Sequence, residues 1–254
     1  MRKKIIKQVV FYLCLLGLWQ LIVAMKIWPE YVFPSPIQVF GTIITGFSNS
    51  TFIVAIGISL KRIAIGYGIS ILIGGFLGIM MSKFKTVDET LGSLVLGLQT
   101  LPSICWLPLA LLWFGLNERA IIFVVIMGAL FSITTATDSG IKHVSPIYIK
   151  AGRNMGARRY TLFLEVIIPA AMPSIISGLK QGWSFAWRSL MAGELLFVNL
   201  GLGYLLTVGR ELNDMSQVLA VMIIIALISI LVDKIVFGKI EANIKRKWGL
   251  SAKY

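Results

Sequence analysis

The chain has 254 residues, of which 57% are hydrophobic, and its mean hydropathy is +0.86. Soluble domains carry about 45–50% apolar residues, so one soluble core does not explain this composition. The net charge of +13 comes from 24 Lys and Arg residues that cluster between apolar blocks, as in cytoplasmic loops of membrane proteins. We therefore expect a multi-pass membrane protein that does not bind nucleic acid.

The first part of the chain predicts two membrane spans joined by an outer segment. An apolar run at about residues 9–25 follows four basic residues and is long enough to be an uncleaved first span. Prolines at positions 29, 34 and 36 interrupt the next stretch, which we expect to lie outside. The second span covers about residues 52–82. Small residues recur in it every fourth position and favour close helix packing: Gly66, Ser70, Gly74 and Gly78.

The third apolar block, at about residues 91–114, contains Pro102 and Pro108, so we expect a kinked or broken helix. Broken membrane helices often line cavities. A fourth span at about residues 120–137 returns the chain to a long polar connection. The fifth and sixth spans follow at about residues 170–198 and 215–237, and a basic tail ends the chain.

The distribution of Lys and Arg predicts how these six helices are oriented. Seventeen of the 24 lie in segments that six crossings place on one side, and only Lys26, Arg119 and Arg210 lie in the opposite loops. The positive-inside rule makes the first side cytoplasmic, so both termini should be cytoplasmic. We expect one all-α domain over residues 1–254, located in the inner membrane of the cell.

The sequence lacks the residues that nucleotide binding, metal binding and catalysis commonly require. There is no G-x-x-x-x-G-K-[ST] nucleotide-binding loop. Cys14 and Cys105 have no Cys or His at metal-ligand spacing, and the single histidine, His143, lies in a polar connection. We therefore expect no enzyme activity and no bound metal or cofactor in this chain.

One segment of the long connection resembles a known motif. It reads Lys150-Ala151-Gly152-Arg153-Asn154-Met155-Gly156-Ala157. Nine residues, 157–165, separate Gly156 from the second part, Val166-Ile167-Ile168-Pro169. It is similar to the EAA loop, E-A-A-x-x-x-G, nine residues, then I-x-L-P, of permease subunits of binding-protein-dependent ABC importers. Ala151, Gly156 and Pro169 match that motif. Lys150 replaces its Glu and Gly152 its second Ala.

Further stretches resemble one branch of this superfamily, the nitrate/sulfonate/taurine-type permeases. They are FPSPIQV at 33–39, SLKRIAIGY at 59–67, LQTLPSICWLPLALLWFG at 98–115, GELL at 193–196 and GLGYLL at 201–206. The resemblance implies the type I ABC importer permease fold, pairing of two copies, two ATPase subunits on the cytoplasmic side and an external solute-binding protein. ATP and Mg would be bound by the ATPases.

The resemblance also implies a coupling helix in the region of about residues 146–163. The residues expected to contact the ATPase are Lys150, Ala151, Gly152, Arg153, Gly156, Ala157 and Pro169. Small side chains at Ala151, Gly152, Gly156 and Ala157 would let this helix enter a groove on the partner. The alternative is a basic helix that rests on anionic lipid at the membrane surface.

The fifth span has two different faces when it is projected at 100° per residue. Small residues gather on one side and include Gly178 and Gly182. Polar and aromatic residues gather on the other, and we expect the solute pathway to involve Lys180, Ser184, Trp187, Arg188 and Glu194, with Gln99 from the broken third block. An arginine at the centre of a membrane helix costs about 2.5–3.5 kcal/mol even on lenient scales, so it should face protein or water.

Structural explanations for the same charges remain open. In the structural explanation for Lys180, its side chain extends to the cytoplasmic interface of the membrane. In the structural explanation for Arg188, it pairs with an acid on another helix or with Glu194 of a second copy. Lys61 and Arg62 either anchor at lipid headgroups or form an entrance to the pathway, and anchoring is the favoured interpretation.

The resemblance implies that the protein transports a small solute by alternating access. The cationic Arg188 favours an anionic solute such as a sulfonate or nitrate. The runner-up solute is a pyrimidine-type vitamin precursor, which relatives of this branch also carry. A channel or secondary transporter that needs no nucleotide is the competing class, and the EAA-like loop argues against it.

Overall fold

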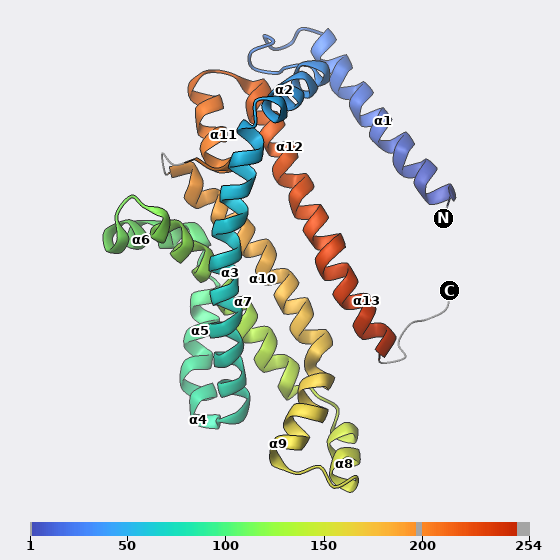
Figure 1. Ribbon diagram of the computed structural model, residues 1–254, viewed down its shortest axis with the longest axis vertical. Helices are drawn as coiled ribbons and strands as arrows, with labels where there is room; N and C mark the ends of the chain where they lie inside the picture. Colours follow the sequence, from blue (N-terminus) through green and yellow to red (C-terminus); the bar gives the residue numbers. More distant parts are fainter. Residues whose placement is uncertain (1, 197–199, 248–254) are drawn as a thin grey trace. The chain divides into compact units, whose positions relative to one another are not determined.

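The computed structural model describes residues 2–196 and 200–247, and the regular secondary structure of this part of the chain is all helical (Figure 1). The α-helices are α1 (Arg2–Ala24), α2 (Pro36–Ser48), α3 (Thr51–Lys83), α4 (Lys85–Val87), α5 (Ser93–Gln99), α6 (Leu107–Phe114), α7 (Glu118–Lys142), α8 (Pro146–Asn154), α9 (Arg159–Thr161), α10 (Ile168–Leu196), α11 (Leu202–Glu211), α12 (Met215–Val232) and α13 (Gly238–Lys247). Wider π-helical turns occupy Asp88–Gly92, Leu162–Ile167 and Asp233–Phe237, and Ser103–Trp106 forms a 3₁₀ turn.

Five helical stretches of the described chain are long and apolar enough to cross a membrane. They are Ile6–Ala24, Thr51–Lys83, Glu118–Lys142, Arg159–Leu196 and Met215–Ile244. A sixth candidate is a pair of segments, Lys85–Gln99 and Ser103–Phe114, that meet at an angle of 103°. The all-α fold is confirmed, with five candidate spans and a sixth if the bent pair is counted as one span, and the third block is broken as the prolines predicted. The break falls at Pro102, which has no N–H to continue a helix.

The predicted ends of the helices shift in places. The fourth span was expected to end at residue 137, but α7 continues to Lys142, and its last turn contains an ion pair between Lys142 and Asp138 (Nζ–Oδ2 2.8 Å). The predicted end of the fifth span at residue 198 lies outside the described residues. After α12 the helical path continues through Asp233–Phe237 into α13, beyond the predicted residue 237.

Among the short helices of the described residues that lie outside the predicted elements are α2 and α11. Of these, α2 has a readable signal, because Ser35 and Gln38 form a reciprocal capping box and Pro36 occupies the first turn. The other, α11, follows Gly201 and carries no comparable cap.

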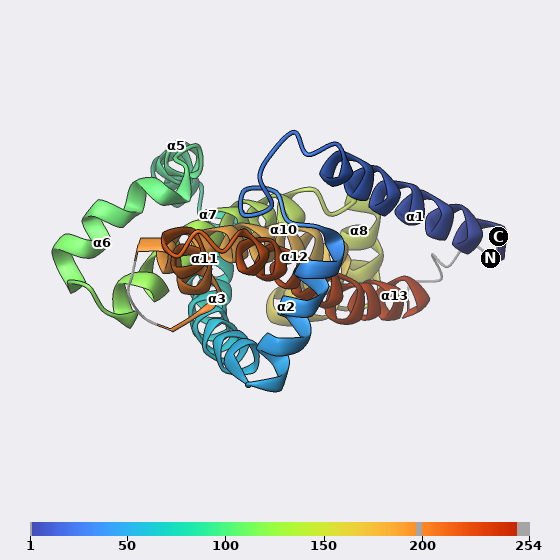
Figure 2. The same ribbon diagram turned by 90° about the horizontal axis from the view of Figure 1, so that it is seen from above.

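The chain divides into two units, one comprising Met1–Ser59 with Glu194–Leu227 and the other Leu60–Gly193 with Ile228–Tyr254. In the second unit, α3 and α10 both pack on α7 through small residues (Figures 1 and 2). A β-carbon added to Gly66, Gly74 or Gly78 would lie within 3.0 Å of α7 atoms. Ser70 donates to the carbonyl of Ile126 at 3.2 Å.

The same close approach occurs between α10 and α7. A β-carbon on Gly178 would overlap Ala136, and one on Gly182 would lie 2.8 Å from Ile133. The structure therefore places both predicted small-residue stripes at helix contacts on α7, where only a hydrogen atom fits.

The first unit is built around a buried carboxylate. Glu194 is fully buried and accepts hydrogen bonds from the Ser59 hydroxyl (2.8 Å) and from the backbone N–H of Gly203 (2.9 Å). Ser59 Oγ in turn accepts the N–H of Leu202 at 3.0 Å. A side chain at Gly201 or Gly203 would collide with this carboxylate. These contacts fix the start of α11 beside the first part of α3.

Candidate functional site

The predicted coupling region folds as a short helix supported by the chain itself. Gly152, near the end of α8, is buried, and a β-carbon there would lie 2.9 Å from Val166 Cγ2 and 3.0 Å from Leu162 Cδ1. Gly152 therefore faces the π-helical turn Leu162–Ile167 and does not contribute its small size to the outward surface of α8. For this residue the expectation of a contact inside a partner's groove is wrong.

Gly156 ends α8 for a conformational reason. Its φ is +89°, and no atom lies within 4 Å of the place where a β-carbon would stand. The N–H of Ala157 donates to the Gly152 carbonyl (2.9 Å), and the N–H of Gly156 donates to the Arg153 carbonyl (3.0 Å). This is a Schellman C-cap, in which glycine supplies the left-handed residue.

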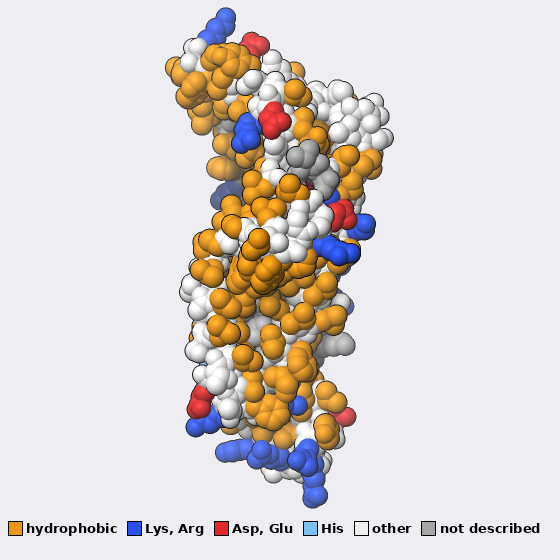
Figure 3. Space-filling model, turned by 90° about the vertical axis from the view of Figure 1, so that its left-hand side faces the viewer, with side chains coloured by type: hydrophobic (Ala, Val, Ile, Leu, Met, Phe, Trp, Pro, Cys, Tyr) orange, Lys and Arg blue, Asp and Glu red, His pale blue; other side chains and the backbone are white. Residues whose placement is uncertain are grey.

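The outward surface of this region is basic. Lys150, Arg153, Arg158 and Arg159 are exposed, and none of them forms an ion pair with a carboxylate in the described part of the chain. Figure 3 shows Lys and Arg side chains gathered at the end of the molecule that carries α8 and α9 in Figure 1. Ala151 is also exposed, whereas Ala157 and Pro169 are half-buried.

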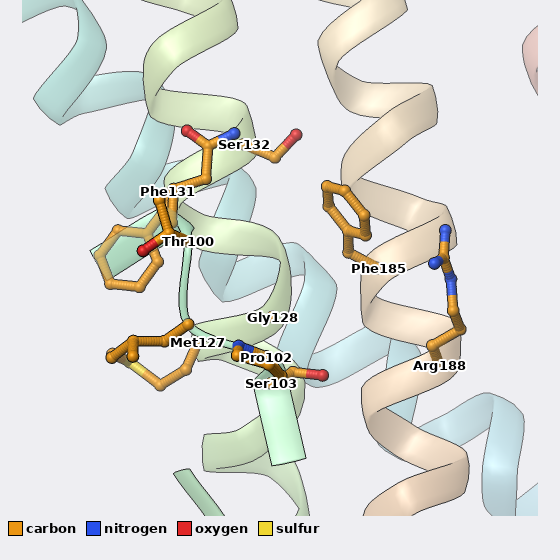
Figure 4. Close-up of a pocket in the computed structure, with 11 residues that line it drawn as sticks. Thr100, Pro102, Ser103, Met127, Gly128, Phe131, Ser132, Phe185 and Arg188 are labelled. Atoms are coloured by element: carbon orange, nitrogen blue, oxygen red, sulfur yellow. The ribbon is translucent and has the colours of Figure 1, made fainter. Parts of the chain in front are cut away.

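The break in the third span opens beside a cavity in the second unit. The cavity has a volume of about 290 Å³ and is lined by residues of the break, of α7 and of α10 (Figure 4). They are Gln99, Thr100, Leu101, Pro102, Ser103, Met127, Gly128, Phe131, Ser132, Phe185 and Arg188. Two of the predicted pathway residues, Gln99 and Arg188, therefore lie at one cavity.

Arg188 is exposed and makes only weak contacts within the described chain. Its Nε donates to the carbonyl of Ser184 at 3.3 Å, and its guanidinium carbon lies 5.1 Å from the centre of the Phe185 ring. Figure 4 shows the side chain running along α10. Arg188 pairs with no carboxylate of the described residues.

The other residues of the predicted polar face do not line this cavity. Lys180 pairs with Asp233 on the last π-helical turn (Nζ–Oδ1 3.0 Å), and Trp187 is buried against Trp183 with ring centres 6.0 Å apart. The Ser184 hydroxyl donates to its own helix at Lys180. Glu194 belongs to the buried network with Ser59. Nothing in their geometry supports a contact of these four with solute.

Arg62 differs from the expected headgroup anchor. It is buried, with 3% of its side chain exposed, and its Nη2 lies 3.2 Å from Glu118 Oε1 at the start of α7. The anchoring interpretation is therefore wrong for Arg62, because a buried, paired guanidinium does not reach lipid headgroups. Lys61, next to it, is exposed.

An ionic contact joins the end of α7 to the segment that leads to Gln99. Lys142, the last residue of α7 before α8, binds Asp88 (Nζ–Oδ1 2.5 Å) as well as Asp138. Asp88 begins the π-helical turn that leads into α5, and α5 ends at Gln99. One lysine thus joins the end of α7 to the segment that carries the cavity-lining amide.

Comparison with known proteins identifies the family. The profile of the family described as "Binding-protein-dependent transport system inner membrane component" matches residues 70–246, which is most of the chain. The chain belongs to this family. It is a multi-pass inner-membrane permease subunit of an ABC importer, a non-enzymatic component of the transporter, and the resemblance predicted from its motifs is confirmed.

Similar proteins agree with this assignment. The permease is 39% identical over 178 residues to a putative ABC transporter permease protein of Methanocaldococcus jannaschii, covering 70% of this chain and 67% of that one. It is 29% identical over 224 residues to the taurine transport system permease protein TauC of Escherichia coli, covering 86% and 82%. It is 32% identical over 221 residues to the formylaminopyrimidine transport permease protein ThiX of Halalkalibacterium halodurans, covering 87% and 88%.

A solved structure shares the fold of the permease. The chain superposes with a TM-score of 0.61 and 22% identity on a chain from the crystal structure of an amino acid ABC transporter with histidines, covering 80% of this permease and 96% of that chain. Membership of this family excludes the competing class, a channel or secondary transporter that needs no nucleotide. The permease family has no cofactor of its own, and among the described residues no cluster of three metal-ligating side chains occurs.

Sequence reasoning missed several residues of the cavity. Ser132, Phe131 and Phe185 lie in apolar spans where a single serine or a phenylalanine resembles ordinary packing. The polar run from Ser132 to Thr137 inside α7 was a usable signal, since hydroxyl groups in a membrane span usually face other helices or a cavity.

Proposed function

We propose that the permease carries a small anion into the cytoplasm through the cavity beside Arg188. Two copies of the chain pair, two ATPase subunits dock on α8 and its flanking residues, and an external binding protein delivers the solute. Nucleotide-driven movement of α8 switches the cavity between the two sides of the membrane. ATP and Mg²⁺ belong to the ATPases.

The observation that carries this proposal is an exposed arginine, without a carboxylate partner in the described chain, at a cavity within a membrane span. A guanidinium stays charged at any physiological pH and presents fixed donors that suit oxyanions. Keeping such a group inside a membrane protein is costly unless it has a functional or structural partner. A negatively charged solute supplies that partner during transport.

The structural alternatives for Arg188 receive less support. Pairing with Glu194 of a second copy conflicts with the position of that carboxylate, which is fully buried and already accepts bonds from Ser59 and Gly203. The name of the relative TauC supports a solute with a negatively charged sulfonate group, since taurine carries one. The name of ThiX supports the second candidate, a formylaminopyrimidine-type solute, for which the Phe131 and Phe185 rings at the cavity offer stacking surfaces.

A reconstitution experiment tests the proposal. The permease, co-expressed with its cognate ATPase, should purify as a complex, and proteoliposomes with the binding protein should accumulate labelled taurine only when ATP is supplied on the ATPase side. Accumulation of formylaminopyrimidine but not of any anion would transfer the assignment to the second candidate. Uptake without ATP would contradict the importer mechanism.

The orientation of the permease follows from its charge asymmetry and is tested with two exposed asparagines. In a variant lacking Cys14 and Cys105, Asn117→Cys at the start of α7 should react in intact cells with a membrane-impermeant thiol reagent. Asn154→Cys at the end of α8 should react only after the cells are permeabilised. Labelling of position 154 in sealed cells would reverse the predicted topology.

A further inference from the structure

We propose that the cavity selects solutes with two polar groups, an oxyanion held at Arg188 and a second hydrogen-bonding group, such as a hydroxyl or an ammonium, held at Ser132 and Gln99. This inference rests on the proposed function and narrows its substrate class. A bare inorganic anion would satisfy only one of the two polar positions.

The evidence for the second position is a pair of unsatisfied polar groups. Ser132 is 3% exposed, and its hydroxyl has no hydrogen-bond partner among the described residues. The Oε1 atom of Gln99 is likewise buried without a partner. Both residues line the same cavity as Arg188. Buried polar groups are nearly always paired in folded proteins, so two unpaired ones at one cavity indicate a missing ligand group.

The chemistry of these groups defines what they bind. An amide oxygen accepts a hydrogen bond, and a serine hydroxyl both donates and accepts. Their common complement is an O–H or N–H donor on the solute. Neither group carries a charge, so the second position discriminates by hydrogen bonding rather than by net charge.

Apolar side chains lie between the two polar positions of the cavity. Figure 4 shows Ser132 on α7 and Arg188 on α10, with Phe185 between them in this view. Gln99 comes from a third element, the end of α5. Phe131 and Met127 add further apolar wall to the cavity. A solute with a short hydrocarbon link between its two polar ends matches this pattern.

The volume of the cavity also favours a solute larger than a bare inorganic anion. Its volume is about 290 Å³, whereas one water occupies only about 30 Å³ of liquid. An anion of the size of nitrate would leave most of this space unfilled, and the hydroxyl of Ser132 and the amide of Gln99 would stay unpaired.

Three sulfonates of nearly equal size test the inference: ethanesulfonate, isethionate with an added hydroxyl, and taurine with an added ammonium. Their binding is measured by calorimetry on the permease in nanodiscs without nucleotide or binding protein. We expect isethionate and taurine to bind at least about tenfold more tightly than ethanesulfonate, because a site with unfilled polar groups rejects the analogue that lacks the matching one. Nitrate should bind more weakly than all three.

Substitutions then assign the preference to residues. Ser132→Ala and Gln99→Leu should each reduce the preference for isethionate over ethanesulfonate to less than about threefold. Ser189→Ala is the matched control, because Ser189 is also a buried serine but donates to its own helix at Phe185 and does not line the cavity. This control should keep the full preference.

The outcomes separate this inference from the proposed function. Equal binding of the three sulfonates by the unsubstituted permease, or a preference that survives both substitutions, would overturn the two-group site. If Arg188→Gln nevertheless weakened the binding of all three sulfonates, the proposed anion pathway would remain supported without the two-group site. Failure of all three sulfonates to bind would contradict both.

Discussion

Replacing Arg188 by glutamine is expected to slow ATP-dependent uptake of an anionic solute at least about tenfold, which corresponds to ~1.4 kcal/mol. Glutamine keeps amide donors at the cavity but removes the positive charge. Arg188 has no carboxylate partner in the described chain, so its loss leaves no buried charge uncompensated. Complex yield and basal ATP hydrolysis should therefore change little. The measurement combines initial uptake rates in proteoliposomes with the yield of purified complex.

Lys180→Gln provides the matched control on the same helix. Lys180 does not line the cavity but pairs with Asp233 at 3.0 Å. Both members of this pair are partly exposed, so its loss should change the yield of folded permease little, and the preference for anions over neutral solutes should stay unchanged. Normal uptake in Arg188→Gln would exclude the pathway role, and loss of assembly in that variant would indicate a structural arginine.

Replacing Gly152 by leucine is expected to abolish stimulation of ATP hydrolysis by solute-loaded binding protein. A β-carbon at this position would already lie 2.9–3.0 Å from Val166 and Leu162, so a leucine forces α8 away from its support. If α8 is the element that the ATPase moves, its displacement uncouples hydrolysis from transport. The long membrane helices do not depend on this contact, and membrane insertion should remain intact.

Gly156→Asn is the control for this second experiment. Gly156 has open space around it and needs only a residue that tolerates φ of +89°, which asparagine does better than other non-glycine residues. Most of the stimulation should survive in this variant. Full stimulation of ATP hydrolysis in the Gly152→Leu variant would show that packing of α8 against Leu162 and Val166 is irrelevant to coupling.

The membrane helices could be predicted from sequence because they depend on length and apolarity alone. The break in the third span was predictable for an equally local reason, since Pro102 removes a donor and blocks helix continuation. Glycine spacing correctly singled out the surfaces of α3 and α10 that touch α7. These signals act within one element and need no knowledge of its neighbours.

The faces of α10 could not be assigned in the same way. A projection at 100° per residue groups Trp187, Arg188 and Glu194 on one side, yet the structure gives each of them a different environment. Trp187 stacks on Trp183, Arg188 lies at the cavity and Glu194 binds Ser59. Periodicity gives the direction of a side chain but not the identity of the element that meets it.

In the coupling region, too, the sequence alone could not predict the role of each residue. The helix α8 lies within the segment that carries the motif. The small residues there have different structural roles: Gly152 is packed inside the chain, Gly156 adopts a positive φ, and Ala151 is exposed. A sequence pattern does not distinguish a glycine required by packing from one required by backbone conformation.

The buried network around Glu194 has a consequence for how the permease is made. Ser59 and Glu194 are 135 positions apart in the chain, and synthesis proceeds from the N-terminus at about 5–20 residues per second. The first part of α3 therefore emerges from the ribosome several seconds before the carboxylate that Ser59 will bind. Until then the Ser59 hydroxyl must use its own helix or water. The glycines at positions 201 and 203, which leave room for the carboxylate, arrive within ten residues of it, so the network closes as one of the late events of biogenesis.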